Sequence, residues 1–506
     1  MKENNNKNAP SSKRVFGAGM EKLIPENSKK NCEIFGLDPQ ELLTPEHLFD
    51  VLPKYLYAKA REKGALTQWT TNLHLKYLIV HNKLFDGSKK TSANDFLKSF
   101  HTILDSIKEE GFMAEKSVIP INQNMDFVDG NHRIAAALVY GKKVAVSRVK
   151  DQWKTLNFEE LHKRGFDSEY LDQAILQYCR LKPKTRLAIM FPIIKEKYGK
   201  IEEMLAQHNI CYKKDIYFNQ TGIGNLIAQM YKPKDWLNTQ TRERHANRRF
   251  VKGKPVRILV LEPKNNKALV KTKTEIRKMF HHETLPIHTS DDQEETVRLA
   301  EQLFNENSVH FFNNANPTKY QNFYEQFQHY KSWLQEGGHD KENFCVDGGA
   351  ILAVYGLRDC GDIDYIDFKN IRCNHENIDS HNDFLHLHEK PLKELVFDPP
   401  NYFYYDGYKF LTPSLLGKMK QRRKDIQDKD DIELILSLSP SSSSVKKLKT
   451  LFSLKNIWNY VVIRLGRILW TSYRYSPKWL KPIILKIYHL IFKKMYQRIR
   501  KFLWNY

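Results

Sequence analysis

Apolar residues along this chain follow two patterns. Short continuous runs at 118–121, 144–146 and 256–261 have the length and composition of buried strands. Longer stretches place apolar residues three to four positions apart, which is the spacing of one helix face, and they predict helices at 134–140 and after Ser290. Ser290 is followed three residues later by a glutamine, a capping-box pattern for a helix start. The two patterns together predict a chain of mixed α and β structure.

Two aspartates separated by one apolar residue follow a glycine pair. Asp362 and Asp364 flank Ile363, and side chains two apart in a strand share a face, so the two carboxylates should project together. Such carboxylates suit Mg2+ (or Mn2+), which proteins usually hold with one or two carboxylates and substrate phosphates. Gly348 and Gly349 have no side chains, so their backbone N–H groups can approach phosphate oxygens closely, and a helix following them adds its positive end. The spacing predicts a site for a metal-bound nucleoside triphosphate (NTP).

This stretch resembles the signature of the nucleotidyltransferase superfamily, which has the polymerase-beta-like fold. An arginine after a second glycine, here Arg358 after Gly356, is most similar to the abortive-infection type and its relatives. A second match follows, where Lys418 and then Arg422 or Arg423 precede a Gln-Asp-Lys-Asp-Asp-Ile-Glu-Leu segment at 427–434. It resembles the closing helices of the same group, which carry a Lys, an Arg and a segment of this kind. Two motifs in the expected order are stronger than one, although single motif matches also arise by accident.

The resemblance implies roles for specific residues. The implied set is Asp362 and Asp364 as catalytic, metal-holding carboxylates, Asp398 as a third catalytic carboxylate, and Gly348, Gly349, Arg358 and Lys418 as nucleotide-binding residues. For Asp398, which ends an apolar run and precedes two prolines, a turn aspartate is an equal alternative. The substrates implied are an NTP and an acceptor.

A second phosphate-binding candidate lies at 129–133, between predicted strands and an alanine-rich helix. Gly130 and the helix start form an anion cradle, to which Arg133 adds a charged fork. The segment resembles the ParB/sulfiredoxin superfamily, which includes partition nucleotide-binding proteins and free-serine kinases. The resemblance implies nucleotide binding by Asp129, Gly130, His132 and Arg133. The alternative is a turn kept for its geometry, with His132 as a structural hydrogen-bond donor.

The charge of the chain is concentrated at its C-terminal end. The segment 445–506 has fifteen Lys and Arg residues and no Asp or Glu, so it carries +15 of the +22 net charge and leaves +7 for the rest. Apolar residues recur there at helical spacing, and four of the eight tryptophans lie among them. Amphipathic helices with Trp and cations are typical of an anionic membrane surface. The alternatives are a hairpin packed on the body and a nucleic-acid arm, which does not need so much Ile, Leu and Trp.

These features predict a Mg2+-dependent nucleotidyltransferase. We expect it to be cytoplasmic and peripherally attached to the inner face of the cell membrane, where it would act on an acceptor glycan, lipid or other macromolecule in surface-polysaccharide or lipid-linked glycan assembly. One rival is a nucleotidyltransferase toxin or defence protein that modifies RNA or protein. Another is a ParB-like nucleotide- or DNA-binding adaptor with an inactive transferase domain, which the modest charge of the body disfavours.

The predicted fold class is α/β and α+β multidomain, since 506 residues exceed a single core. The expected parts are a disordered tail (1–20), a ParB/sulfiredoxin-like domain (21–160), a central α/β domain (161–335), a nucleotidyltransferase domain (336–436), a Ser-rich linker (437–444) and basic amphipathic membrane-surface helices (445–506).

Overall fold

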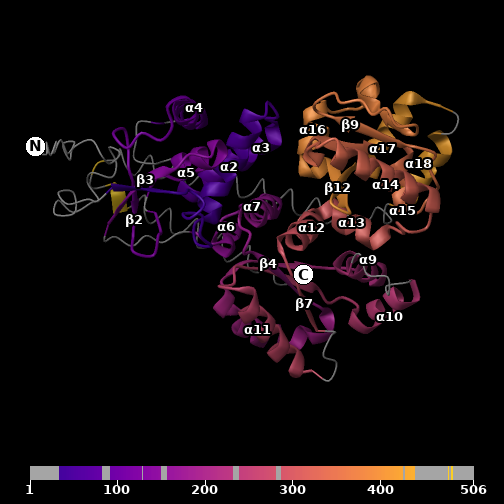
Figure 1. Ribbon diagram of the computed structural model, residues 1–506, viewed down its shortest axis with the longest axis horizontal. Coiled ribbons are helices and arrows are strands. Elements are labelled where there is room, and N and C mark those ends of the chain that lie inside the picture. The colour runs from indigo at the N-terminus through magenta and orange to yellow at the C-terminus, as the bar shows by residue number, and fades with distance from the viewer. Residues whose placement is uncertain are drawn as a thin grey trace, which may run out of the picture. The chain divides into compact units, whose positions relative to one another are not determined.

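The computed structural model describes residues 34–82, 90, 92–127, 129–149, 156–231, 239–280, 286–425, 428–438, 477 and 480–482. The chain divides into two compact units, Met1–Leu438 and Ser439–Tyr506. The described elements of the first unit form three small sheets with helices packed on them (Figure 1). This mixture confirms the predicted mixed α and β class at the coarse level.

Several predicted segments fall outside the described residues. They are the tail at 1–20, nearly all of the linker at 437–444, and the helices predicted at 445–506 apart from residues 477 and 480–482. Among the residues that are described, no helix is both long enough and apolar enough to cross a membrane.

The N-terminal part carries the first sheet, in the order β1-β3-β2. Its elements are β1 (Ile34–Leu37), α2 (Leu48–Glu62), α3 (Gln68–Asn82), α4 (Ala93–Glu110), β2 (Ile119–Ile121), α5 (Asn131–Tyr140) and β3 (Val144–Arg148). β3 pairs antiparallel with β1 and parallel with β2. Ala135, Ala136 and Ala137 are fully buried, because their small side chains let α5 pack closely against α2 and α4.

The central part contains a sheet in the order β5-β6-β4-β7, antiparallel throughout. Its elements are α6 (Phe158–Lys163), α7 (Ser168–Leu181), β4 (Arg186–Met190), the 3-10 helix η1 (Pro192–Lys197), α8 (Tyr198–Leu205), η2 (Ala206–His208), β5 (Ile210–Ile216), α9 (Gln220–Met230), α10 (Thr239–Arg249), β6 (Val256–Leu261), α11 (Asn266–Lys278), β7 (Ile287–Thr289), α12 (Gln293–Leu303) and α13 (Glu306–Asn314). An antiparallel sheet makes this part α+β rather than the expected α/β.

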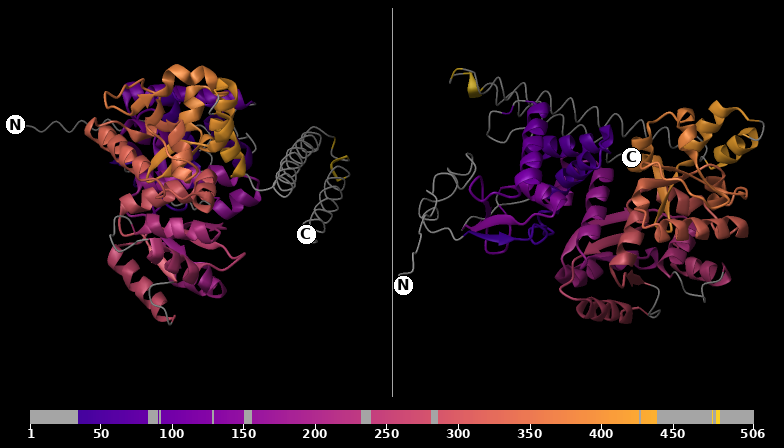
Figure 2. Two further views of the ribbon diagram at one scale, coloured as in Figure 1. Left: turned by 90° about the vertical axis from the view of Figure 1, so that its right-hand side faces the viewer. Right: turned by 45° about the horizontal axis from the view of Figure 1, so that its top comes forward.

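Both faces of the central sheet are covered. Ala188 and Met190 of β4 pack in a small core with α8 and α11, while Leu187 and Ile189 face the main core of the unit. This alternation is the period-two pattern of a strand buried on both sides. In Figure 1 and Figure 2, α11 lies on one side of the sheet and α9 and α12 on the other.

The third part has a mixed sheet in the order β10-β9-β8-β12-β11. Its elements are α14 (Gln321–Glu336), η3 (Lys341–Asn343), β8 (Phe344–Asp347), α15 (Gly349–Tyr355), β9 (Ile363–Asp367), β10 (Ile378–Ser380), η4 (His381–Leu387), α16 (Leu392–Phe397), η5 (Pro399–Asn401), β11 (Tyr402–Tyr405), β12 (Tyr408–Leu411), α17 (Pro413–Arg423) and α18 (Asp428–Ser437). β8 pairs antiparallel with β9 and parallel with β12. α14, α15 and α16 contact the sheet, and α17 and α18 pack together beside α15.

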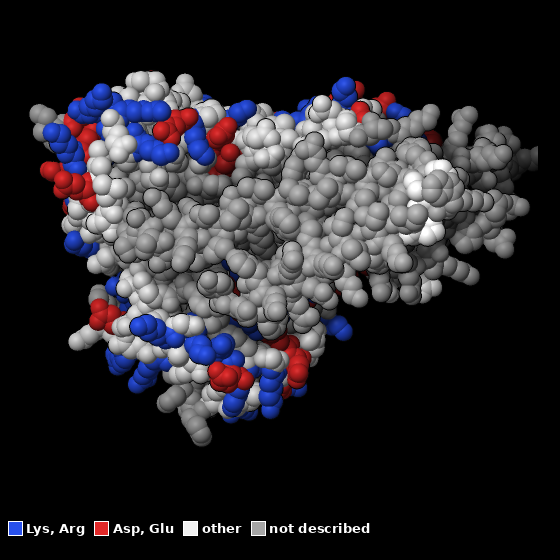
Figure 3. Space-filling model, turned by 180° about the vertical axis from the view of Figure 1, so that it is seen from behind, with Lys and Arg blue, Asp and Glu red and all other residues white. Residues whose placement is uncertain are grey.

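The three parts of the first unit share one core. A single cluster of buried apolar side chains extends from Leu42 to Ile435. Helix α7 packs against α2 and α12, and Arg180 near its end contacts Glu301 at 2.9 Å and Glu342 at 3.1 Å. The described surface is mixed in charge: on the face in Figure 3, Lys and Arg side chains are interspersed with Asp and Glu.

Candidate active site

Asp364 lies in β9 and Asp362 directly precedes this strand, so the alternation of side chains places the two on one face. Both are partly exposed, while Ile363 and Tyr365 are fully buried on the other face. Burial and the nearby charges of Asp364 and Asp379 raise the pKa of Asp362. The negative charges of Asp364 and Asp379 thus disfavour the charged form of Asp362, and a cation nearby would relieve this repulsion.

Gly348 lies directly against this pair. Its φ is +63°, a conformation that only glycine adopts readily, and a Cβ added there would overlap the carboxylate of Asp364 and lie 2.9 Å from its Cβ. A Cβ on Gly349 would meet the guanidinium of Arg358 at 3.5 Å, which is ordinary contact. The glycine pair thus lies against the aspartate pair. At Gly348 the carboxylate of Asp364 leaves no room for a side chain.

One histidine, His381, contacts the carboxylate of Asp364, and a second, His388, contacts the neighbouring Asp347. His381 Nε2 is 3.0 Å from Asp364 Oδ1. The other ring nitrogen of His381, Nδ1, is 3.4 Å from Asp347 Oδ2. The same oxygen of Asp347 is 3.0 Å from His388 Nε2. Burial opposes the charge on His381, but its hydrogen bonds to Asp347 and Asp364 outweigh burial and raise its pKa to about 10. Asp347 is fully buried, yet His381 and His388 hold its pKa well below the usual range.

The two sequence motifs are joined by an ion pair. Arg358 places Nε 2.5 Å and a terminal nitrogen 2.8 Å from the two oxygens of Asp431, which lies in the second motif. Asp431 also contacts buried Lys420 at 2.7 Å, and Lys420 contacts Asp428 at 3.0 Å. The acids of the second motif therefore anchor α18 to α17 through Lys420, and to the segment after α15 in the first motif through Arg358. The guanidinium fork of Arg358, predicted to bind phosphate, is occupied by this pair.

The structure does not bring Lys418 to the aspartate pair. Its Nζ lies 2.7 Å from Glu389 Oε2, and both side chains are substantially exposed. Arg423, five residues further along α17, pairs with Asp425 at 2.9 Å and with Asp428 at 2.7 Å. The hydrogen bond to Asp428 is the main cause that raises the pKa of Arg423, and Asp364 makes a smaller contribution.

Asp398 lies away from Asp362 and Asp364. It follows α16 and precedes β11, which β8 and β12 separate from β9 in the sheet. Its Oδ1 accepts a hydrogen bond of 2.6 Å from Thr67, in the N-terminal part, and burial raises its pKa to about 6. The prediction of Asp398 as a third metal-facing carboxylate is thereby corrected, and the alternative of a turn aspartate fits its position.

Asp379 is the carboxylate that neighbours the pair instead. It stands opposite Asp364 in the register of the parallel strands β9 and β10, so the two side chains share a face. Among the described residues, no group of three or more His, Cys, Asp or Glu side chains is arranged to hold a metal ion. The donors present, Asp362 and Asp364, fit Mg2+ in the mode that uses one or two carboxylates with substrate phosphates.

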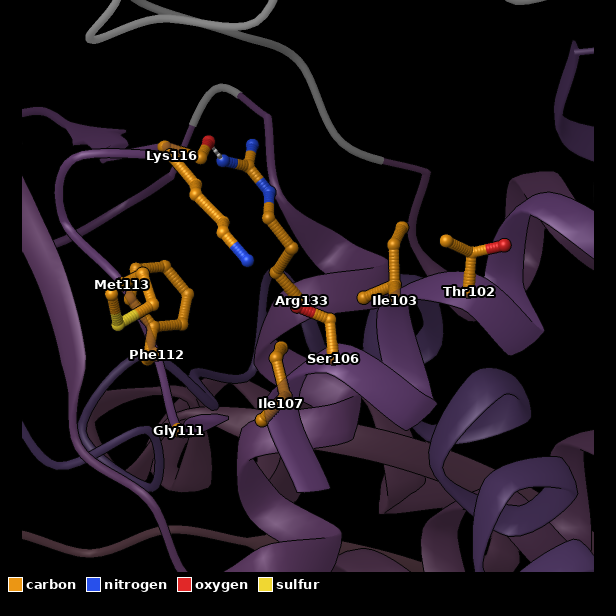
Figure 4. Close-up of a pocket in the computed structure, with 10 residues that line it drawn as sticks. Thr102, Ile103, Ser106, Ile107, Gly111, Phe112, Met113, Lys116 and Arg133 are labelled. Atoms are coloured by element: carbon orange, nitrogen blue, oxygen red, sulfur yellow. Dashed lines mark hydrogen bonds between the residues drawn. The ribbon is translucent and has the colours of Figure 1, made fainter. Parts of the chain in front are cut away.

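The N-terminal turn forms a second polar site. Gly130 has φ +112°, and a Cβ there would lie 3.0 Å from Ile119 Cγ1 and 3.2 Å from the guanidinium of Arg133. Arg133 donates to Asp129 at 3.1 Å and to Ser117. Figure 4 shows the side chains of Arg133 and Lys116 at a pocket of about 220 Å3, opposite apolar residues of α4. Arg133 is thus positioned at a pocket, although Asp129 and Ser117 already engage its donors.

His132 points into the core instead. Its ring lies 4.7 Å from Phe100 and 5.7 Å from His74, and its Nε2 is buried without a hydrogen-bond partner among the described residues. Burial and the nearby charge of Lys54 lower its pKa far below the usual value. This packing does not support the prediction that His132 binds nucleotide, because its ring faces Phe100 and His74 and its Nε2 is buried.

Sequence reasoning did not identify His381, His388 or Asp347 as site residues. Asp347 directly precedes the glycine pair. It is a charged residue at the end of an apolar strand, and this position is the feature of the sequence that could have identified it. The two histidines lie more than thirty residues away in η4 and the turn after it, where no spacing marked them. Comparison of the chain with protein-family models, with curated proteins and with solved structures finds no match in any of the three.

Proposed function

We propose that the third part of the chain is a nucleotidyltransferase that moves a nucleotidyl group from an NTP to an acceptor. The observation that carries the proposal is the contact between Asp364, on the same strand face as Asp362, and the side-chain-free turn at Gly348. Carboxylates beside the backbone N–H groups of a turn without side chains suit a divalent ion and a polyphosphate together.

Asp362 and Asp364 would hold Mg2+, which when bound supplies the charge that neutralises and orients a triphosphate. The backbone of Gly348 and Gly349 would seat the phosphates. His381 would keep Asp364 in one orientation, since its ring also contacts buried Asp347.

The acceptor belongs to the same proposal. We infer a glycan or lipid-linked acceptor at the inner face of the cell membrane, because the sequence of 445–506 combines fifteen cations with four tryptophans. This context rests on the sequence of the tail and on analogy with enzymes that act at membrane surfaces.

Label transfer tests the proposal. The full chain is incubated with each α-labelled NTP and Mg2+ together with pools of lipid, glycan, RNA and protein. We expect label to enter the lipid or glycan pool with the wild type and not with the double variant Asp362→Asn, Asp364→Asn. The matched control is Asp383→Asn, because this aspartate is 71% exposed and pairs only with exposed Arg372 among the described residues. Label in RNA or protein would favour the toxin or defence alternative, and transfer by the double variant would refute the assignment.

A further inference from the structure

A second pocket of about 220 Å3 lies where the N-terminal part, α7 and the third part meet. Its walls include Lys59 of α2, Trp69 of α3, Gln177 of α7 and Glu342. Glu342 precedes β8, whereas the candidate active site lies beyond the other end of that strand. The residues of the N-terminal turn at 129–133 do not line it. The pocket is therefore separate from both sites described above.

Positive charge is in excess around this pocket. The charged side chains that line it are Lys59, Lys63, Arg180, Lys409, Asp340 and Glu342. Lys63 pairs with Asp340 at 3.1 Å, while Arg180 and Lys409 share Glu342 at 3.1 and 3.8 Å. Four cations thus face two carboxylates. Two more charged side chains, Glu301 and Lys341, lie behind the wall, 3.6 Å from each other. Their charges cancel, so the cations still outnumber the carboxylates by two.

Two polar groups in the wall are left for a ligand. Among the described residues Lys59 has no ion-pair or hydrogen-bond partner, and its ammonium lies 5.8 Å from the ring of Tyr55. Burial and the positive charges of Arg180 and Lys63 lower the pKa of Lys59. Gln177 is 3% exposed, and its amide likewise has no hydrogen-bond partner among the described residues. Lys59 is half-buried and Gln177 is almost fully buried, so both can offer hydrogen-bond donors to a ligand in the pocket.

The remaining wall is apolar and partly planar. Trp69, Phe397 and Tyr402 line the pocket together with Gln173 and Gln177. The ammonium of Lys409 lies over the rings of Phe397 and Tyr402, and Gln173 donates to the carbonyl of Phe304, so Trp69 and Gln177 are the ring and the amide that a sugar would contact. A ring face with amides beside it suits a sugar, whose C–H face packs on aromatic rings while its hydroxyls hydrogen-bond. The volume is below the roughly 300–1,000 Å3 of pockets that hold drug-sized ligands, which favours a compact anion over a nucleoside triphosphate.

We propose that this pocket binds a monosaccharide phosphate, with the phosphate at Lys59 and Arg180 and the sugar ring against Trp69 and Gln177. This pocket is distinct from the candidate nucleotidyltransferase site, and the sugar-phosphate proposal does not depend on the nucleotidyltransferase proposal. The pocket lies between α2, α7 and the segment before β8, so an occupant would tie the N-terminal part to the third part of the chain.

Binding is measured by calorimetry on the full chain without NTP or Mg2+, so that failure of the nucleotidyltransferase proposal leaves the result unaffected. The probes are glucose 1-phosphate, glucose 6-phosphate, glucose, inorganic phosphate and AMP. We expect a sugar phosphate to bind more tightly than glucose, phosphate or AMP. Lys59→Met should weaken it about tenfold or more, since a charge-assisted hydrogen bond is lost. Lys59→Arg should retain most of the affinity.

The control is Lys98→Met, an exposed lysine on α4 outside the pocket. Unchanged melting temperatures would show that the Lys59 variants fold. The proposal would be overturned by no binding of either sugar phosphate at millimolar concentration, by equal affinity in Lys59→Met and wild type, or by tighter binding of AMP.

Discussion

Substituting Gly348 by alanine should damage the candidate active site through two separate costs. The φ of +63° and ψ of −147° at Gly348 lie in a region almost reserved for glycine, where an alanine costs about 1–3 kcal/mol. The new Cβ also overlaps the carboxylate of Asp364, which must move away from His381, 3.0 Å from it, and so loses a charged hydrogen bond of about 1–3 kcal/mol. Together the expected loss in the free energy of unfolding is about 2–6 kcal/mol.

Urea unfolding followed by tryptophan fluorescence measures this loss, with Gly361→Ala as the matched control. Gly361 directly precedes Asp362, but a Cβ added there meets no atom within 4 Å. Its substitution should change stability by less than about 1 kcal/mol. The double variant Gly348→Ala, Asp364→Ala removes the overlapping carboxylate, so its loss should be smaller than the sum of the two single losses by about 0.5–3 kcal/mol. A Gly348→Ala protein as stable as the control, or strictly additive losses, would refute the proposed contact.

Three further predictions follow from other features. Asp431→Asn removes the negative charge that pairs with both Arg358 and Lys420, so the free energy of unfolding should fall by about 1–3 kcal/mol. In the same urea titration, Asp383→Asn, which changes an exposed aspartate, should alter the free energy of unfolding by less than about 0.5 kcal/mol. Burial lowers the pKa of Lys54 to about 7, below its value in the unfolded chain, so between these two values the unfolded chain binds one more proton than the folded chain. The free energy of unfolding should therefore rise from pH 7 towards pH 10 more steeply in the wild type than in Lys54→Met. Equal slopes in the two proteins would contradict this. Removing 445–506 should abolish co-sedimentation with anionic liposomes at low salt, and undiminished sedimentation would reject the membrane-surface role of that segment.

The sequence predicted the elements that depend on local pattern. The alanine-rich helix and the strands beside it appear as α5, β2 and β3, and the run at 256–261 is β6. The helix expected after Ser290 begins at Gln293, but Asp292 caps it, because its side chain accepts from the backbone of Glu295. The aspartate pair and the glycine pair also followed from local rules, since alternation along a strand and the conformational freedom of glycine need no distant information.

The rest of the site depends on contacts between distant segments. The resemblance predicts Asp398 as a third catalytic carboxylate. In the structure its hydrogen-bond partner is Thr67, 331 residues away, and the order of the strands separates Asp398 from β9. Lys418 and Lys420 are two residues apart, and only the packing of α17 against α18 decides that Lys420 is buried between two acids while Lys418 remains exposed. A sequence motif shows which residue types are available, but tertiary packing decides which of them meet.

The most direct test of the central claim is Mn2+ binding measured by electron paramagnetic resonance, with and without a non-hydrolysable NTP. Asp362 and Asp364 beside the turn at Gly348 should bind the ion weakly alone and much more tightly with the nucleotide, since the phosphates complete its oxygen ligands. The wild type and Asp383→Asn should show this nucleotide-dependent binding, and Asp362→Asn with Asp364→Asn should lose it. Equal Mn2+ and nucleotide binding in the double variant and the wild type would contradict the account.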